Sequence, residues 1–241
     1  MRKTRVIFLA VLLIGLSTSF AGVVMAGSKP SIGVAEFRNT AHASWWRTGM
    51  GWDLAGMVSN ELSSLGHFRV VERSKLKHVL REQDLGASGR VRKSTAAKMG
   101  RLTGAQYLVM GTVTSYEERT SGVGGGFSFG PIRLGGKKDK AYISVDLRVV
   151  DTTTGEIVHS RSIEANSSGG GVDVGLHFGG FRSQMGGFAK TPAGKAIRAC
   201  VMEIVDYLDC VMIKKDSCVD EFDLKEQKRK AKTKSAISLD E

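Results

Sequence analysis

The stretch from Ala141 to Ile163 constrains the fold of this chain more than any other. Its first half alternates apolar with polar residues, the period-two pattern of a β-strand with one buried face. The apolar positions are Ile143, Val145, Leu147 and Val149. A turn at residues 151–155 and a return strand from Ile157 complete a long β-hairpin. Glycine-rich insertions, residues 121–136 and 167–187, adjoin its open ends, and we expect them to carry the function.

Residues 1–26 have the pattern of a secretory signal peptide. Basic residues are followed by an apolar run over residues 6–16 and by a small-residue cleavage site before Gly27. The apolar run is shorter than a bilayer span requires, so we expect cleavage rather than a helical membrane anchor. The protein is therefore predicted to be exported. No cysteine lies near the cleavage point, and we expect the protein not to be lipid-anchored.

The net charge of the chain is +11, and it falls to +8 when the three basic residues of the signal peptide are removed. Six basic residues lie between Lys225 and Lys234, in a segment poor in large apolar side chains. Residues 214–241 are therefore predicted to form a charged, disordered tail. Because the chain is exported, its charge does not indicate a nucleic-acid partner.

The three cysteines, Cys200, Cys210 and Cys218, lie near the C-terminus. If Cys200 and Cys210 share one helix, they are roughly 15 Å apart and cannot form a disulfide. A bond between Cys210 and Cys218 is possible in an oxidising compartment. Cys200 falls on an apolar helix face, where a buried free thiol is expected.

The remaining elements alternate between strands and helices. Strands rich in β-branched and aromatic residues are predicted over residues 31–37, 68–72 and 106–116. Helical spacing of apolar residues predicts helices over residues 50–64, 74–85 and 191–211, and a further short helix is expected over residues 94–104. Together these predict one α/β domain over residues 27–213, with a mixed β-sheet and flanking helices.

The second insertion, within residues 164–190, alternates apolar residues with small or polar ones. Val172, Val174, Leu176 and Phe178 fall on one face, opposite Asp173 and His177. Gly179-Gly180 can turn the chain, so the pattern predicts a transmembrane β-hairpin with the apolar face toward lipid. The alternative is a flexible glycine-rich surface loop.

The first insertion, within residues 117–140, has a weaker form of the same pattern. Phe127 and Phe129, also predicted to face lipid, precede a turn near Gly130-Pro131. Four strands from one chain would leave unpaired backbone groups in the bilayer, each costing several kcal/mol. The two hairpins are therefore predicted to contribute to an oligomeric transmembrane β-barrel built from several copies.

The chain has no residues that support an enzyme. The glycine-rich stretches lack the complete dinucleotide fingerprint and the lysine of a phosphate loop. Its five histidines make no metal-ligand pair at helical spacing, and no nucleophile elbow is present. We expect no catalytic, cofactor or metal site, which leaves a binding or transport role.

Several motifs in order resemble the curli secretion channel family, the CsgG/HfaB group. They are Val71-Glu72-Arg73 with Leu76 and Leu80, the run Leu102 to Tyr116, and Val145 to Ile157. The likeness covers about residues 32–213. It implies a homo-oligomeric ring in the outer membrane and periplasm, exporting unfolded fibre or adhesin subunits without nucleotide hydrolysis. Periplasmic accessory proteins are further possible partners.

The resemblance also implies a pore constriction formed by the loop after the first strand. Here that loop includes Ala41, Trp45 and Trp46, where the family has a Tyr and an Asn-Phe pair. The residues themselves leave two alternatives for the tryptophan pair, a hydrophobic flap over the core or an exposed contact for a partner. A second hypothesis for the whole protein is a soluble periplasmic scaffold, similar to the lipoprotein activators of peptidoglycan synthases.

Overall fold

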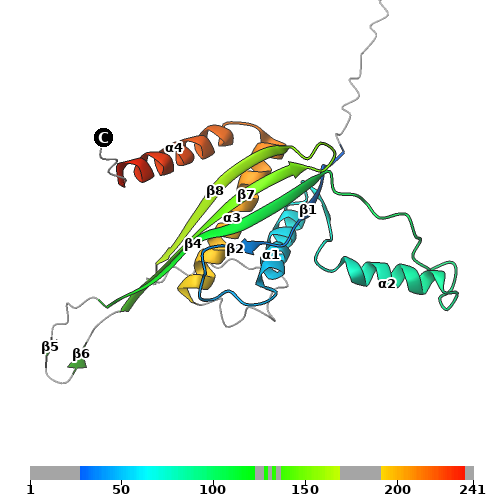
Figure 1. Cartoon of the computed structure of the whole chain (residues 1–241), viewed down its shortest axis with the longest axis horizontal. Helices are drawn as coiled ribbons and strands as arrows, with labels where there is room; N and C mark the ends of the chain where they lie inside the picture. The colour runs from blue at the N-terminus through cyan, green and yellow to red at the C-terminus, as the bar shows by residue number, and fades with distance from the viewer. Residues whose placement is uncertain (1–27, 123–127, 130–131, 134–136, 169–190, 237–241) are drawn as a thin grey trace, which may run out of the picture.

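The computed structural model describes residues 28–122, 128–129, 132–133, 137–168 and 191–236 (Figure 1). The strands of the main sheet are β1 (Ser31–Val34), β2 (Arg38–Asn39), β3 (Arg69–Val71), β4 (Tyr107–Gly122), β7 (Lys137–Asp151) and β8 (Ile157–Ser168). The helices are α1 (Met50–Leu65), α2 (Leu76–Ala87), α3 (Pro192–Asp209), the π-helical turn η1 (Cys210–Lys214) and α4 (Cys218–Ala236).

The sheet is mixed, as the sequence predicts. Its order is β3-β1-β4-β7-β8, and β2 pairs with β4 to one side of this path. Strand β1 lies parallel to both β3 and β4, whereas β7 is antiparallel to β4 and to β8. The β7–β8 pair is the predicted hairpin, with Val145 opposite Ile163. Strand β1 ends three residues before the predicted boundary.

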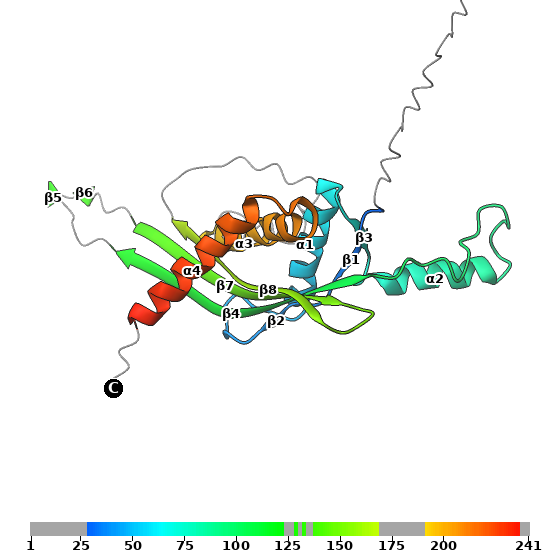
Figure 2. The same cartoon turned by 90° about the horizontal axis from the view of Figure 1, so that it is seen from above.

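Helices α1 and α3 cover one face of this sheet (Figure 2). The alternating residues of β7 identified in the sequence point into that layer and are buried, as is Ile163 of β8. Ile204 and Leu208 of α3 and Leu62 of α1 are also buried there. Burial of this much apolar surface, at roughly 25 cal/mol per Å², is the main stabilising contribution to the domain.

The ends of α1 and α3 follow local sequence signals. The side chain of Thr191 accepts a hydrogen bond from the backbone N–H of Gly194, and Pro192 occupies the first turn of α3. Gly66 ends α1 in a left-handed conformation, with φ of 70°, which a residue with a Cβ rarely adopts. Both helices lie where the apolar spacing predicts them.

The short helix predicted over residues 94–104 is wrong. The backbone N–H groups of Thr95 and Ala96 both donate to the carbonyl of Arg92, which makes a single turn. Gly100, four residues after that turn, has a φ of 72°, which is not a helical conformation. A helix this short needs packing to stabilise it, and Met99 and Leu102 are exposed.

The disordered tail predicted over residues 214–241 is also wrong, because most of it forms α4. Two features hold the start of this helix. Cys210 and Cys218 form a disulfide, with Cα atoms 6.0 Å apart, while Cys200 remains a buried free thiol. Arg161 of β8 binds the carbonyl of Phe222 and the carboxylate of Asp223. Apolar periodicity is weak in α4, so the sequence pattern does not reveal this anchoring.

Candidate functional site

Strands β4 and β7, which precede and follow the tip of the first insertion, form a long antiparallel ribbon that extends from the sheet. Strands β4 and β7 stay paired from Tyr107 opposite Asp151 to Gly122 opposite Lys137, with one irregularity between Val113 and Ser115. At about 3.3 Å per residue, strands of 16 and 15 residues are roughly 50 Å long. Figure 1 shows both strands continuing past the helices that cover the sheet.

Strand β8 accompanies the ribbon as far as Ser168, which lies opposite Lys140. The second insertion therefore begins beside the first, at the same end of the sheet. Near this end, Ala141 and Ile143 of β7 and Ala165 of β8 remain buried on the α3 side. The ordered pairing therefore places the described ends of both insertions at one end of a well-packed sheet.

Within the first insertion, β5 (Ser128–Phe129) pairs antiparallel with β6 (Ile132–Arg133). Phe129 lies opposite Ile132. The turn predicted near Gly130-Pro131 lies outside the described residues. Five of the six residues predicted to face lipid lie outside the described residues. They are Phe127, Val172, Val174, Leu176 and Phe178. The signal peptide also lies outside them.

The predicted constriction loop lies at the base of the ribbon. The backbone N–H groups of Thr40 and Ala41 donate to the carbonyl of Val113 in β4. Trp45 is 7% exposed and belongs to the core, with its ring 5.7 Å from that of Tyr116 and 5.5 Å from that of Trp46. Burial of Trp45 agrees with the alternative of a hydrophobic flap.

Ala41 and Trp46 are partly exposed beside this flap. The pore constriction itself stays a prediction. Sequence reasoning missed Tyr116 as the partner of Trp45, although an aromatic residue near the end of a strand is a usable signal for such a contact. Burial and the Glu118 carboxylate, which accepts a hydrogen bond from the Tyr116 hydroxyl, raise the pKa of Tyr116.

A groove of about 810 Å³ separates the second half of α4 from β4, β7 and β8 at the base of the ribbon. Tyr142 and Glu164 line it on the strands, and Arg229 and Lys232 line it on α4. Burial and the nearby Glu164 carboxylate raise the pKa of Tyr142 to about 12, so its phenol is protonated near neutral pH. This groove brings acidic and basic side chains together.

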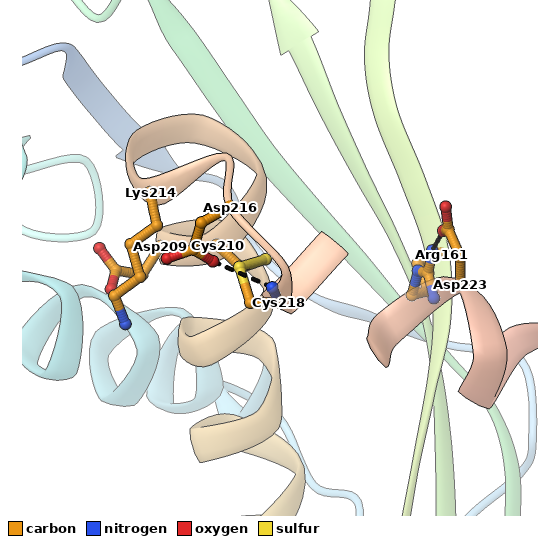
Figure 3. Close-up of a disulfide and its surroundings, with 7 residues drawn as sticks. All are labelled: Arg161, Asp209, Cys210, Lys214, Asp216, Cys218 and Asp223. Carbon is orange, nitrogen blue, oxygen red and sulfur yellow. Dashed lines mark hydrogen bonds and ion pairs between the residues drawn. A yellow bond between two sulfur atoms is a disulfide. The ribbon is translucent and has the colours of Figure 1, made fainter. Parts of the chain in front are cut away.

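An ion-pair cluster fixes the junction between α3 and α4 (Figure 3). The buried Asp209 carboxylate lies 2.6 Å from Nδ1 of His67 and 2.9 Å from Nζ of Lys214. Burial would raise the pKa of Asp209, but hydrogen bonds from Lys214 and His67 outweigh it and lower that pKa. The cluster and the adjacent Cys210–Cys218 disulfide direct the chain from the core into α4.

The described residues contain no group of three His, Cys, Asp or Glu side chains placed to hold a metal ion. Among them, no helix has both the length and the apolar composition needed to cross a membrane.

The structure thus defines an α/β domain with a mixed sheet, one helical layer and a projecting β-ribbon. Residues 19–237 match the family described as curli production assembly/transport component CsgG. The chain therefore belongs to this family, as the sequence motifs predict.

One relative is the "Putative lipoprotein NMB1126/NMB1164" of Neisseria meningitidis serogroup B. It is 30% identical over 152 residues, which are 63% of this chain and 60% of that protein. Because that name describes a lipoprotein, it contradicts the expectation that the present protein is not lipid-anchored, and we withdraw that expectation.

Two solved structures are also similar. The hypothetical protein CT253 from Chlamydia trachomatis is 14% identical, with a TM-score of 0.44, covering 77% of this chain and 99% of that one. Lipoprotein GNA1162 from Neisseria meningitidis is 17% identical, with a TM-score of 0.35, covering 73% and 99%. Because both TM-scores are below 0.5, neither similarity is evidence for function.

Proposed function

We propose that this protein is a homo-oligomeric outer-membrane secretion channel that exports unfolded fibre or adhesin subunits without nucleotide hydrolysis. The observation that carries the proposal is the pairing of β4 with β7, which continues past one irregularity as far as Gly122 and Lys137. This pairing holds Gly122 and Lys137 side by side, as a hairpin in the first insertion requires. Membership of the CsgG family supports the same function.

Beyond Ser168 of β8, the described part of the ribbon is only two strands wide. An isolated two-stranded hairpin is at best marginal in water, and its open edges are costly in lipid. Copies arranged side by side would pair these edges and close a barrel. On this proposal each copy contributes both insertions, residues 117–140 and 164–190, to the shared wall.

The constriction loop fits the same arrangement. Ala41 is hydrogen-bonded to β4 at the base of the ribbon, so this loop would lie at the mouth of the barrel. Trp45 would brace the loop from the core, and the partly exposed Trp46 and Ala41 would face the passing chain.

Two adjacent substitutions in the second insertion test the proposal. Leu176→Arg places a charge on the predicted lipid face, at a cost of roughly 2 to 4 kcal/mol near the bilayer centre. His177→Arg places the same side chain on the predicted lumen face and serves as the matched control. We expect the first variant to lose membrane insertion and channel conductance, and the second to keep both.

Wild-type protein is imaged in detergent and recorded in planar bilayers alongside these variants. Rings with a central hole and measurable conductance are expected. If the wild-type protein is instead released as a single chain with the periplasmic contents, the channel proposal fails. That result would favour the alternative, a periplasmic scaffold that binds a cell-envelope enzyme.

A further inference from the structure

The excess positive charge of the chain is concentrated in one projection, residues 73–104, which we name the basic arm. It contains nine Lys and Arg residues against two Asp and Glu residues, a net charge of +7. The mature chain as a whole is only +8, and residues 214–241 contribute a net +1. The arm, rather than the C-terminal segment, therefore accounts for the basicity of the protein.

Helix α2 of the basic arm stands away from the sheet and from the other helices in both views (Figures 1 and 2). Only Gln83 of α2 is buried. The segment that follows folds back on the helix, since a Cβ at Gly86 would lie 3.0 Å from the carbonyl of Ala97. The arm is thus a helix with its return segment, held outside the domain core.

The basic arm also exposes large apolar side chains. Leu80 is 43% exposed and Met99 is 62% exposed, and Val79, Leu85 and Leu102 are exposed as well. A helix of 12 residues is marginal by itself in water, so a contact that covers this face would stabilise it. A surface that is both basic and apolar fits an acidic protein surface with apolar residues of its own.

Such a surface is present on this chain at residues 203–223, which we name the acidic corner. It carries seven Asp and Glu residues against two Lys residues, a net charge of −5. Asp220 and Glu221, in the first turn of α4, are exposed and make no ion pair within the part of the chain that the structure describes. Leu224 beside them is 51% exposed.

Crowding of carboxylates at the acidic corner favours an incoming cation. Burial and the neighbouring Glu203 and Asp209 carboxylates raise the pKa of Asp206, and Lys214 and Lys225 offset only part of this effect. A lysine or arginine from another molecule would relieve this repulsion. The corner lies at the junction of α3 and α4 and is well separated from α2 in Figures 1 and 2, so the arm of the same copy does not cover it.

We propose that the basic arm of one copy docks on the acidic corner of the next copy. This inference rests on the proposed homo-oligomeric ring and identifies the contact that joins its domains outside the membrane. The two surfaces differ, so the interface is heterologous, and repeating it from copy to copy generates a closed ring when the rotation closes. Opposite charges fix the register, and the apolar residues supply buried area at the contact.

Charge reversal tests the docking in the full mature chain. Lys77→Glu with Arg81→Glu lowers the net charge of the basic arm from +7 to +3, and Asp220→Lys with Glu221→Lys raises that of the acidic corner from −5 to −1. Each pair is expected to raise the concentration for half-assembly about tenfold or more, measured by light scattering in detergent, because each places like charges opposite one another at the exchanged positions and weakens the attraction between the two surfaces. All four changes in one chain are expected to restore assembly. Lys228→Glu with Lys234→Glu, two exposed sites on α4, serves as the matched control and should leave assembly unchanged.

Carbodiimide cross-linking, which joins lysines to carboxylates, identifies the contact directly. Mixed rings of ¹⁴N- and ¹⁵N-labelled protein are expected to give mixed-isotope peptides joining Lys77 to Asp220 or Glu221. Lys77→Arg keeps the charge but removes the amine, so it should lose this link and keep assembly. Circular dichroism checks that every variant is folded.

The outcomes separate this inference from the function on which it rests. If wild-type rings form and the arm variant forms them equally well, the docking inference is overturned and the channel proposal stands. If wild-type protein remains a single chain, both are overturned. If the arm variant assembles normally but loses binding to phosphatidylglycerol vesicles, the arm binds anionic lipid and the docking inference is again overturned.

Discussion

Helices α2 and α3 have similar amphipathic sequences but opposite surroundings. Eleven residues of α3 are buried between the sheet and α1, whereas a single residue of α2, Gln83, is buried. Apolar residues at spacings of three and four predict both helices correctly, but they do not predict what covers each apolar face. The comparison teaches that an amphipathic pattern predicts an apolar face that must be covered. The surface that covers it can belong to the same chain or to another.

Truncation of a buried side chain of α3 should have the largest effect on the free energy of unfolding. Ile204 is 1% exposed. Replacing it with alanine removes buried methyl groups and leaves a cavity, so we expect Ile204→Ala to lower the free energy of unfolding by about 2 to 5 kcal/mol. Urea unfolding of the wild-type and variant chains measures this difference. A loss below about 0.5 kcal/mol would show that α3 is not the main cover of the sheet.

Removal of the disulfide should leave α4 less firmly attached to the core, as α2 is. Closing a loop of eight residues restricts the unfolded chain, so Cys210→Ser with Cys218→Ser is expected to cost about 2 to 3 kcal/mol. Hydrogen exchange should become faster across α4 and remain slow in α3. Cys200→Ser provides the thiol control, since Cys200 is free and buried in the wild-type chain. Unchanged exchange in α4 would mean that its other contacts, those of Arg161 and of the buried Phe222, are sufficient to anchor it.

Loss of the Asp209 carboxylate should have a smaller, pH-dependent effect. Its pKa is lowered in the folded state, so the stabilisation is complete above the ordinary aspartate pKa and is lost as pH falls through the lower, folded value. Asp209→Asn is expected to cost about 1 to 3 kcal/mol at neutral pH. The stabilities of variant and wild type should converge in strong acid. Unfolding curves from neutral to strongly acidic pH check this, and a constant difference would contradict it.

The smallest effect on the single chain is expected in α2. Leu80 is exposed there, so Leu80→Ala should change the free energy of unfolding by less than about 0.5 kcal/mol. The same change should weaken assembly, because it removes apolar area from the docking face. Unfolding in high salt and assembly in low salt separate the two effects. A large loss of stability in the dissociated chain would place α2 in the core instead.

Much of the fold follows from local pattern. Alternation in Val145 and its neighbours predicts β7, and Thr191-Pro192 predicts the start of α3, because these signals act within a few residues. The helix expected over residues 94–104 is absent, since a short helix without a buried face is not stable.

The site was predicted less completely. Position after the first strand identifies the loop that holds Trp45, but burial of Trp45 against Tyr116 joins residues about seventy positions apart. The anchoring of α4 likewise depends on Arg161, which lies far from Phe222 in sequence. Such contacts leave no periodic trace in either segment. Counting charge by segment, however, would have found the basic arm.

The sequence by itself determined the paired strands, the amphipathic helices and the two glycine-rich insertions, because backbone preference and side-chain periodicity are local properties. Only the tertiary structure decided which apolar faces are covered, because burial depends on what lies opposite a residue in space. It buried α3, anchored α4 through Arg161 and a disulfide, and left α2 exposed.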